Sequence, residues 1–245
     1  MTDTLPFAES DDLPNDIPSL CNPIPYTLVN SRPLTDTPFV APYVPLNPSI
    51  TATALALAGV DSSDTLVDLG CGDGRILVAA LQDPSEQSLL TTNTTTPNTI
   101  TTTTITTTTM IQPCAPSRCI GVELDPYLAA YIRNTQSSLI STGRLVILEQ
   151  DMFTVDLESI DATVIIMYLL PSGLNQLKPQ LAKWLLVGTA PGALSVRRIV
   201  TITYSIPDWN PVQEQWACLS SNSFMGGSSA TPHCLFRYEA KSICY

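Results

Sequence analysis

Two kinds of hydrophobic pattern alternate along most of the chain. Short apolar, β-branched runs predict strands, and longer runs with apolar residues three or four apart predict helices. The expected strands are residues 65–69, 118–124, 145–149, 162–170 and 198–205. The expected helices are residues 75–81, 126–138 and 175–186, preceded by a helix that Ser49 caps and Gly59 ends. This alternation predicts an α/β fold with a Rossmann-like, doubly wound, mostly parallel sheet.

The end of the chain breaks the alternation. Residues 214–220 and 234–242 suit two strands, and a serine- and glycine-rich loop joins them in place of a helix. Parallel neighbours need a long crossover connection, whereas antiparallel strands can be joined by a loop alone. We therefore expect an antiparallel terminal strand in the sheet.

The N-terminal part of the chain does not suit a folded α/β core. Residues 1–48 hold ten of the 21 prolines and six of the 22 acidic residues, with one basic residue. We predict a disordered, proline-rich acidic tail over residues 1–38 and one domain over residues 39–245. Residues 39–48 are apolar and aromatic, so we expect them to pack against that domain.

A threonine-rich stretch interrupts the predicted domain. Residues 91–111 contain 14 threonines and have too little apolar surface to offset the loss of chain entropy on folding. We predict a low-complexity insertion at about residues 84–116, on the surface. An added edge strand or an O-modified loop is the alternative.

Charge and hydropathy narrow the classes of partner. The 245 residues carry a net charge of −11, which disfavours nucleic acid and anionic membranes, so we expect no nucleic-acid partner. The longest apolar run, residues 164–170, is too short to span a bilayer, which takes about 20 residues. The acidic N-terminus resembles neither a secretory signal nor a presequence, so a cytoplasmic location is expected.

The cysteines indicate a reducing compartment. There are seven, an odd number, and no C-x-x-C pair occurs, so we expect free thiols. Structural disulfides, or a zinc site around Cys114, Cys119 and the single histidine, His233, are the less favoured alternatives. We expect no metal site, and we expect His233 at the surface.

The clearest chemical signal is a glycine-rich turn after the first expected strand. It reads Asp-Leu-Gly-Cys-Gly-Asp-Gly-Arg over residues 68–75. Gly70, Gly72 and Gly74, with Cys71 between the first two, allow unusual backbone angles and a close approach of a ligand to the main chain. The helix that follows directs free N–H groups at the same space, which favours an anionic group. In a doubly wound sheet, ligands bind in this crevice.

Three carboxylates indicate which ligand binds there. Asp68 lies two residues before the first glycine, Glu123 ends the second strand and Asp151 follows the third. Glu123 is placed to accept hydrogen bonds from ribose hydroxyls, and Asp151 from an adenine amine. Arg75 stands where the dinucleotide fingerprint has its third glycine, which disfavours a dinucleotide. Three glycines and three acids at consecutive strand ends favour S-adenosyl-L-methionine as the cofactor.

Five segments within residues 39–211 carry a family resemblance. They are residues 42–45, 68–76, 121–124, 168–171 (Tyr-Leu-Leu-Pro) and 208–209 (Asp-Trp). With them the chain resembles class I S-adenosylmethionine-dependent methyltransferases. More narrowly, it resembles the protein-lysine methyltransferases of the ATP synthase c-subunit and the adenine nucleotide translocase, with their bacterial relatives. The glycine motif is common to the class, whereas the last two segments are typical of the narrower group.

The resemblance implies methyl transfer to the ε-amine of a protein lysine. Tyr168, at the end of the fourth strand, is expected to line a desolvating pocket that lowers the pKa of that lysine. Tyr43 and Trp209 are expected at the rim of the pocket. Packing alone is the alternative for Tyr168 and Trp209. The segment 168–171 has no amide or carboxylate, which disfavours adenine or glutamine as the methyl acceptor.

Two other functions stay open at this point. One is a small-molecule methyltransferase on the same scaffold, and the other is a non-catalytic protein that binds S-adenosylmethionine. The threonine-rich insertion and the extra length at residues 189–197 depart from the family pattern. The resemblance also leaves a mitochondrial location open, although no presequence is seen.

Overall fold

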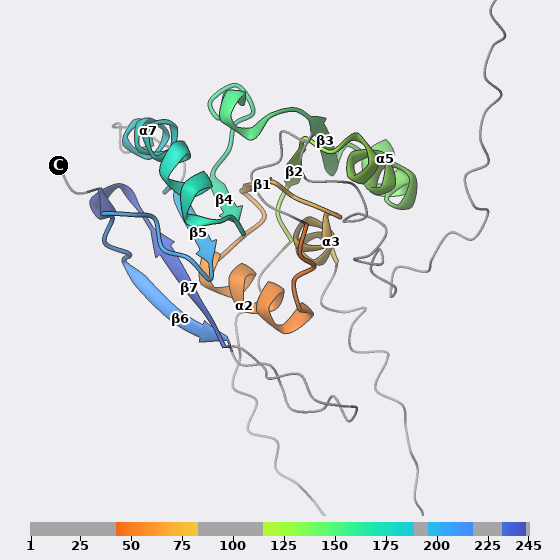
Figure 1. Ribbon diagram of the computed structural model, residues 1–245. Helices are drawn as coiled ribbons and strands as arrows, with labels where there is room; N and C mark the ends of the chain where they lie inside the picture. Colours follow the sequence, from red (N-terminus) through yellow and green to blue (C-terminus); the bar gives the residue numbers. More distant parts are fainter. Residues whose placement is uncertain (1–42, 83–114, 189–195, 218–231, 244–245) are drawn as a thin grey trace, which may run out of the picture.

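The computed structural model describes residues 43–82, 115–188, 196–217 and 232–243. These residues form one sheet with helices on both of its faces (Figure 1). The predicted tail over residues 1–38 lies outside the described residues, as do all but two residues of the predicted insertion.

The sheet has seven strands in the order β3-β2-β1-β4-β5-β7-β6. They are β1 (Thr65–Leu69), β2 (Arg118–Glu123), β3 (Leu145–Glu149), β4 (Val164–Met167), β5 (Arg198–Ile202), β6 (Gln213–Ala217) and β7 (His233–Tyr238). Strands β1 to β5 pair in parallel, whereas β7 runs antiparallel to both β5 and β6. The predicted Rossmann-like, mostly parallel sheet is confirmed. Its antiparallel strand is the last in the chain, as predicted, but lies inside the sheet.

Helices cover the two faces of the sheet separately. They are α2 (Pro48–Ala58), α3 (Arg75–Leu81), α5 (Pro126–Thr135), α6 (Ser137–Ser141) and α7 (Pro171–Val187), with single 3-10 turns η3 (Met152–Thr154) and η4 (Ala240–Ser242). Buried side chains of α2, α3 and α5 pack in one core cluster, and those of α7 pack in the other. Figure 1 shows α7 on the opposite side of the sheet from α2 and α3.

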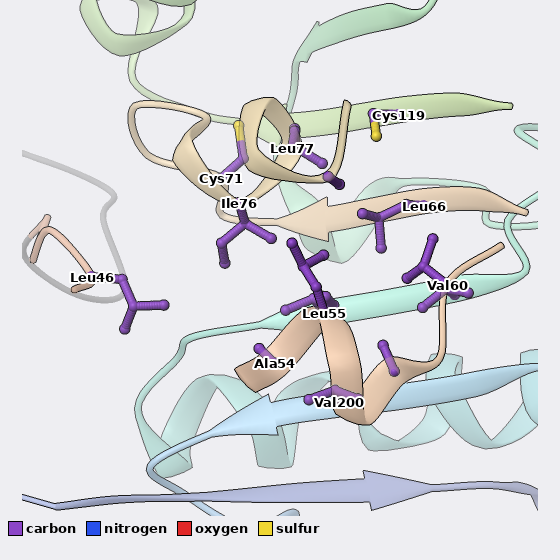
Figure 2. Packing of buried hydrophobic residues seen from close by; sticks show 14 of the residues in the cluster. Leu46, Ala54, Leu55, Val60, Leu66, Cys71, Ile76, Leu77, Cys119 and Val200 are labelled. Atoms are coloured by element: carbon purple, nitrogen blue, oxygen red, sulfur yellow. The ribbon is translucent and has the colours of Figure 1, made fainter. Parts of the chain in front are cut away.

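Each core layer is built on strands that are buried from both sides, as expected for parallel strands under helices. Every residue of β4 and β5 is buried. Figure 2 shows the layer under α2, where Leu55 of the helix lies over Leu66 of β1 and near Val200 of β5. In the described part of the chain, no helix is long and apolar enough to cross a membrane.

Two helix predictions need correction at the ends. Asn47, not Ser49, caps α2: its side-chain Oδ1 accepts hydrogen bonds from the Ser49 amide and hydroxyl, both at 2.9 Å. Pro48 therefore takes the first helical position, where a missing N–H costs nothing. The predicted helix over residues 126–138 is two helices, because the chain leaves the α conformation at Gln136.

The strand order locates the expected ligand site. From β1 the chain winds outward through β2 to β3, and it then crosses to β4 on the other side of β1. The connections therefore diverge between β1 and β4, which opens a crevice at the carboxyl ends of these strands. The glycine turn follows β1 at this edge, and Tyr168 follows β4.

Candidate active site

The glycine turn after β1 has the conformation that its sequence predicts. Gly70, Gly72 and Gly74 all have positive φ angles, of 80°, 59° and 77°. Residues other than glycine rarely adopt such angles. The amides of Gly70 and Cys71 donate to the carbonyl oxygen of Val122 in β2, at 2.9 and 3.0 Å. These bonds hold the turn against the end of the second strand.

Tyr43 lies directly on this turn. A Cβ atom at position 72 would stand 2.9 Å from Cε2 of the Tyr43 ring, so the approach depends on glycine. The ring also packs near Leu128 of α5. The described part of the segment before α2 therefore packs on the domain, as predicted, and Tyr43 covers the glycine turn.

Arg75 fastens that segment in place, a role that its position in the glycine motif did not reveal. Its Nε and Nη2 atoms donate to the two carboxylate oxygens of Asp73, at 2.9 and 2.6 Å. Its Nη1 donates to the main-chain oxygen of Leu46 at 2.5 Å, and its Nη2 to the Tyr43 hydroxyl at 3.0 Å. One guanidinium thus joins the glycine turn to the start of α2.

Glu123 meets the glycine turn from the end of β2. Its Oε2 accepts a hydrogen bond from the Gly72 amide at 2.8 Å, and its Oε1 accepts one from the Asp125 amide at 2.9 Å. The residue is 9% exposed, and desolvation raises the pKa of its carboxyl. Each carboxylate oxygen has a second lone pair, so both oxygens retain capacity to accept a hydroxyl hydrogen bond.

Asp68 is the unusual group of the site. It is the last residue but one of β1, is 2% exposed, and its side chain accepts no hydrogen bond from any described residue. Burial first, and then the charges of Glu123 and Asp73, raise the pKa of its carboxyl to about 8. A buried carboxylate without a partner is costly, and a cation beside it would relieve that cost.

Asp151 stands beside these groups on the next strand. Glu123 and Glu149 are register partners, and the amide of Gln150 donates to the Glu123 main-chain oxygen at 3.0 Å. Asp151 follows and begins the turn η3, where its Oδ1 accepts from the Phe153 amide at 3.0 Å. The second carboxylate oxygen is the one available to a ligand.

The side chain of Cys71 turns away from the ligand side of the turn. It is buried, and its Sγ would lie 2.7 Å from a Cβ at Gly121 of β2. Burial raises the pKa of the thiol. Cys71 was predicted to bind the cofactor, but its side chain packs in the core shown in Figure 2, and its amide and carbonyl bond to Val122 and Gly74.

The three aromatic residues predicted for the acceptor side do not lie together. Tyr168 is half-buried and packs against the core on the α2 face. Trp209 is 7% exposed and packs on the α7 face, with its ring 6.0 Å from that of Tyr238. This burial does not fit an exposed rim position, because the indole packs in the core on the α7 face.

His233 also departs from its predicted place at the surface. It is half-buried at the start of β7, and its ring meets the edge of the Tyr168 ring, with 6.2 Å between the centroids. Sequence separation hid this contact, because β7 returns to lie beside β5. Cys71, Cys119 and Cys234 are free and buried, and no group of acids, cysteines and histidines in the described ranges is placed to hold a metal.

Comparisons with known proteins agree with this geometry. Residues 104–213 match the family described as the ANTKMT methyltransferase domain. A protein-lysine N-methyltransferase of Saccharolobus islandicus (strain REY15A) is 30% identical over 171 residues, which cover 69% of this chain and 81% of the relative. The chain belongs to the protein-lysine N-methyltransferase family.

A solved structure supports the fold of this methyltransferase. It is an RNA methyltransferase from Salinibacter ruber in complex with S-adenosyl-L-homocysteine, with a TM-score of 0.50 and 23% sequence identity. The match covers 80% of this chain and 92% of the other. At this identity the similarity concerns the fold alone, and it carries nothing about RNA as a substrate.

The methyl donor of this methyltransferase is S-adenosyl-L-methionine, and the residues of the site fit its groups. Asp68, whose side chain has no hydrogen-bond partner among the described residues, would suit the donor's ammonium, and Glu123 has lone pairs that would suit two ribose hydroxyls. Asp151 has one oxygen for an adenine amine. When bound, the donor supplies a methyl group already activated on a sulfonium, so the protein mainly has to align the acceptor.

Proposed function

We propose that this methyltransferase methylates the ε-amine of a lysine in a protein. The observation that carries the proposal is the position of Glu123, which joins the Gly72 and Asp125 amides beside the unpartnered Asp68. That arrangement suits an adenosyl donor carrying an ammonium group. The curated relative, a protein-lysine N-methyltransferase, supports lysine as the acceptor.

The edge of the sheet next to the donor residues has the character that a lysine acceptor needs. Tyr168 follows β4, on the other side of the crevice from the glycine turn, and its ring is half-buried. Tyr43 covers the turn itself. Aromatic surroundings disfavour the charged form of an amine, so they lower the pKa of a lysine that enters and favour its nucleophilic form.

Labelling distinguishes the proposal from its alternatives. The full chain is incubated with methyl-labelled S-adenosylmethionine and cell extract, with a Glu123→Ala variant as the inactive control. A labelled protein band that mass spectrometry assigns to lysine supports the proposal. Label in RNA rejects it, and label in a small metabolite supports a small-molecule methyltransferase. Tight donor binding with no labelled product supports a non-catalytic binding protein.

We further propose that the protein acts in a reducing compartment, the cytoplasm. Its buried thiols Cys71, Cys119 and Cys234 are free, which supports such a compartment. Burial raises the pKa of Cys119 to about 12, so this thiol stays protonated and unreactive. Fractionation of cells that express a tagged full chain tests the location, and recovery in mitochondria would reject it.

A further inference from the structure

The single histidine of the chain lies at the carboxyl edge of the sheet, where a neighbouring side chain fixes its ring. His233 begins β7, two residues before Leu235, which is the register partner of Ile202 in β5. Its Nδ1 lies 2.6 Å from the Thr203 hydroxyl oxygen. No described residue is hydrogen-bonded to its Nε2. One ring nitrogen is therefore held and the other is available.

The residue that holds the imidazole is itself in an uncommon conformation. Thr203 has a φ angle of 73°, where a β-branched residue is strained. Its amide donates to the Cys234 main-chain oxygen at 2.8 Å, which keeps this conformation next to His233. Strain of this kind persists where the surrounding structure enforces it, and it is concentrated at functional sites.

The imidazole shares a face and an edge of the sheet with Tyr168. Leu235, two residues along β7, packs in the core under α2, and so does Tyr168. Successive strand residues alternate between faces, so His233 points to that same face. The T-shaped contact between the two rings confirms this placement, with an interplanar angle of 76°. His233 thus lies on the acceptor side of the crevice, opposite the carboxylates that suit the donor.

We infer that His233 is a catalytic residue, whose Nε2 accepts the proton that the acceptor lysine must lose before methyl transfer. The inference rests on the proposed function. In this arrangement Nδ1–H donates to the Thr203 hydroxyl oxygen, 2.6 Å away, and Nε2 keeps its lone pair for the acceptor. Thr203 is the positioning residue: its hydroxyl can accept from Nδ1–H or donate to Nδ1, and the inference requires that it accepts.

The electrostatic surroundings suit a proton acceptor at neutral pH. Desolvation lowers the pKa of His233 below its ordinary value of about 6.5, so the ring is neutral. Three groups of the described residues face the His233 ring. They are the Tyr168 phenol, which follows β4, the Thr203 hydroxyl, which follows β5, and the register partner Ala217 of β6. None of these three groups is a carboxylate, an ammonium or a guanidinium.

The step balances in protons and electrons. One N–H bond of the lysine ammonium breaks, and its proton goes to Nε2 of His233, which becomes an imidazolium. The freed lone pair of the amine then forms the nitrogen–carbon bond to the methyl group. The carbon–sulfur bond breaks, its electron pair stays on the donor's sulfur, and water later removes the proton from the imidazolium.

The tautomer tests the inference without any acceptor. Because the chain has one histidine, a two-dimensional ¹H–¹⁵N spectrum of the full chain labelled at histidine reports His233 alone. We expect the Nδ1–H tautomer in the native protein and a shift toward Nε2–H in Thr203→Val, which keeps the β-branched shape without the hydroxyl. Thr203→Ser should keep the native tautomer. An Nε2–H tautomer in the native protein would overturn the inference, because Nε2 then has no lone pair to offer.

Kinetics provide the second test, with poly-L-lysine as the acceptor. We expect His233→Gln to lower the single-turnover rate at pH 7 about 100-fold or more, as general-base removal does. The deficit should shrink as the pH approaches the lysine pKa of about 10.4, while the donor Kd stays unchanged. A native rate in a folded His233→Gln protein overturns the inference. Failure of the native protein to methylate any lysine would instead reject the proposed function, and the tautomer measurement would still decide the state of His233.

Discussion

At the scale of single residues, the buried carboxyl group of Asp68 makes the stability of the fold depend on pH. It is buried in β1, its side chain has no hydrogen-bond partner in the described part of the chain, and the pKa of the carboxyl is raised to about 8. In the unfolded chain an aspartate titrates near 3.9, so the folded protein holds a proton that the unfolded chain has lost. The stability associated with this proton is present below about pH 4 and disappears as the pH rises through about 8.

Asp68→Asn should therefore change how stability depends on pH. Without donor, the free energy of unfolding of the native protein should fall between pH 5 and 8, by up to about 1.4 kcal/mol per pH unit from Asp68. The Asn variant should lack this slope and should bind the donor more weakly. Urea unfolding at several pH values measures this slope. Asp208→Asn is the control, because the Asp208 side chain is 85% exposed. Identical slopes for the native protein and Asp68→Asn would contradict the assignment.

Gly72 offers a second test at this scale, because the cost of its backbone conformation can be separated from the cost of a clash with Tyr43. Gly72→Ala should be destabilised both by its positive φ and by the 2.9 Å approach of the new Cβ to Tyr43. Gly143→Ala has a similar φ of 73° with no atom within 4 Å, so it should lose only the backbone term of about 1–2 kcal/mol. Thermal melts and donor titrations compare the two.

The Gly72→Ala protein should lose more stability than Gly143→Ala and should bind the donor at least about tenfold more weakly. Adding Tyr43→Ala to Gly72→Ala should return part of the lost stability, because the clash is gone. Equal effects of the two alanine variants would mean that Tyr43 does not cover the turn.

At the scale of elements, Arg198 joins α2 to the sheet. The guanidinium of this first residue of β5 pairs with Asp64, with 2.6 Å between Nη2 and Oδ2. It also donates to the carbonyl oxygens of Ala58 and Gly59, at the end of α2. The pair is almost fully buried and lies at the end of the sheet away from the carboxylates of the site.

Arg198→Met should therefore separate stability from binding. Removing one partner of a buried ion pair leaves the other uncompensated, so we expect a loss of about 3–5 kcal/mol in urea unfolding. Arg133→Met is the matched control, because its pair with Glu149 is exposed and should cost about 1 kcal/mol or less. The donor Kd of the folded Arg198→Met protein should equal that of the native protein. A tenfold weaker donor Kd in Arg198→Met would contradict this separation, because the attachment of α2 to the sheet would then affect donor binding.

Element prediction from sequence succeeds where the local signal is strong. The five parallel strands and the Gly59 end of α2 follow from apolar runs and a left-handed glycine with a φ of 59°. The N-cap at Asn47 was missed because Ser49 is an equally good capping residue. The bonds from Arg75 to Leu46 and Tyr43 could not be predicted, since they join segments about 30 residues apart without any local pattern.

At the scale of the whole molecule, sheet topology decides which distant residues meet. The motif residues Asp68, Gly72 and Glu123 were predictable as neighbours, because the carboxyl ends of β1 and β2 share one edge. His233 and Trp209 were misplaced for the opposite reason. Nothing local shows that β7 inserts between β5 and β6, and this insertion brings His233 to Tyr168.

The same topology separates the residues that we propose for the donor from those that we propose for the acceptor. Carboxylates that suit the donor lie at the ends of β1, β2 and β3, whereas Tyr168 and His233 follow or begin strands on the other side of the β1–β4 boundary. An acceptor can therefore vary without changes at the donor residues, which agrees with a shared fold among methyltransferases of different substrates.

The measurement that tests the account most directly is calorimetric titration of S-adenosylmethionine into Glu123→Gln and Glu149→Gln. The two glutamates are register partners on β2 and β3, but Glu123 joins the Gly72 and Asp125 amides while the Glu149 side chain is exposed. We predict that the donor Kd rises at least about tenfold in Glu123→Gln, because a charge-assisted hydrogen bond is lost. In Glu149→Gln the donor Kd should stay within about twofold of the native value. Equal affinity in both variants would contradict the placement of the donor at the glycine turn.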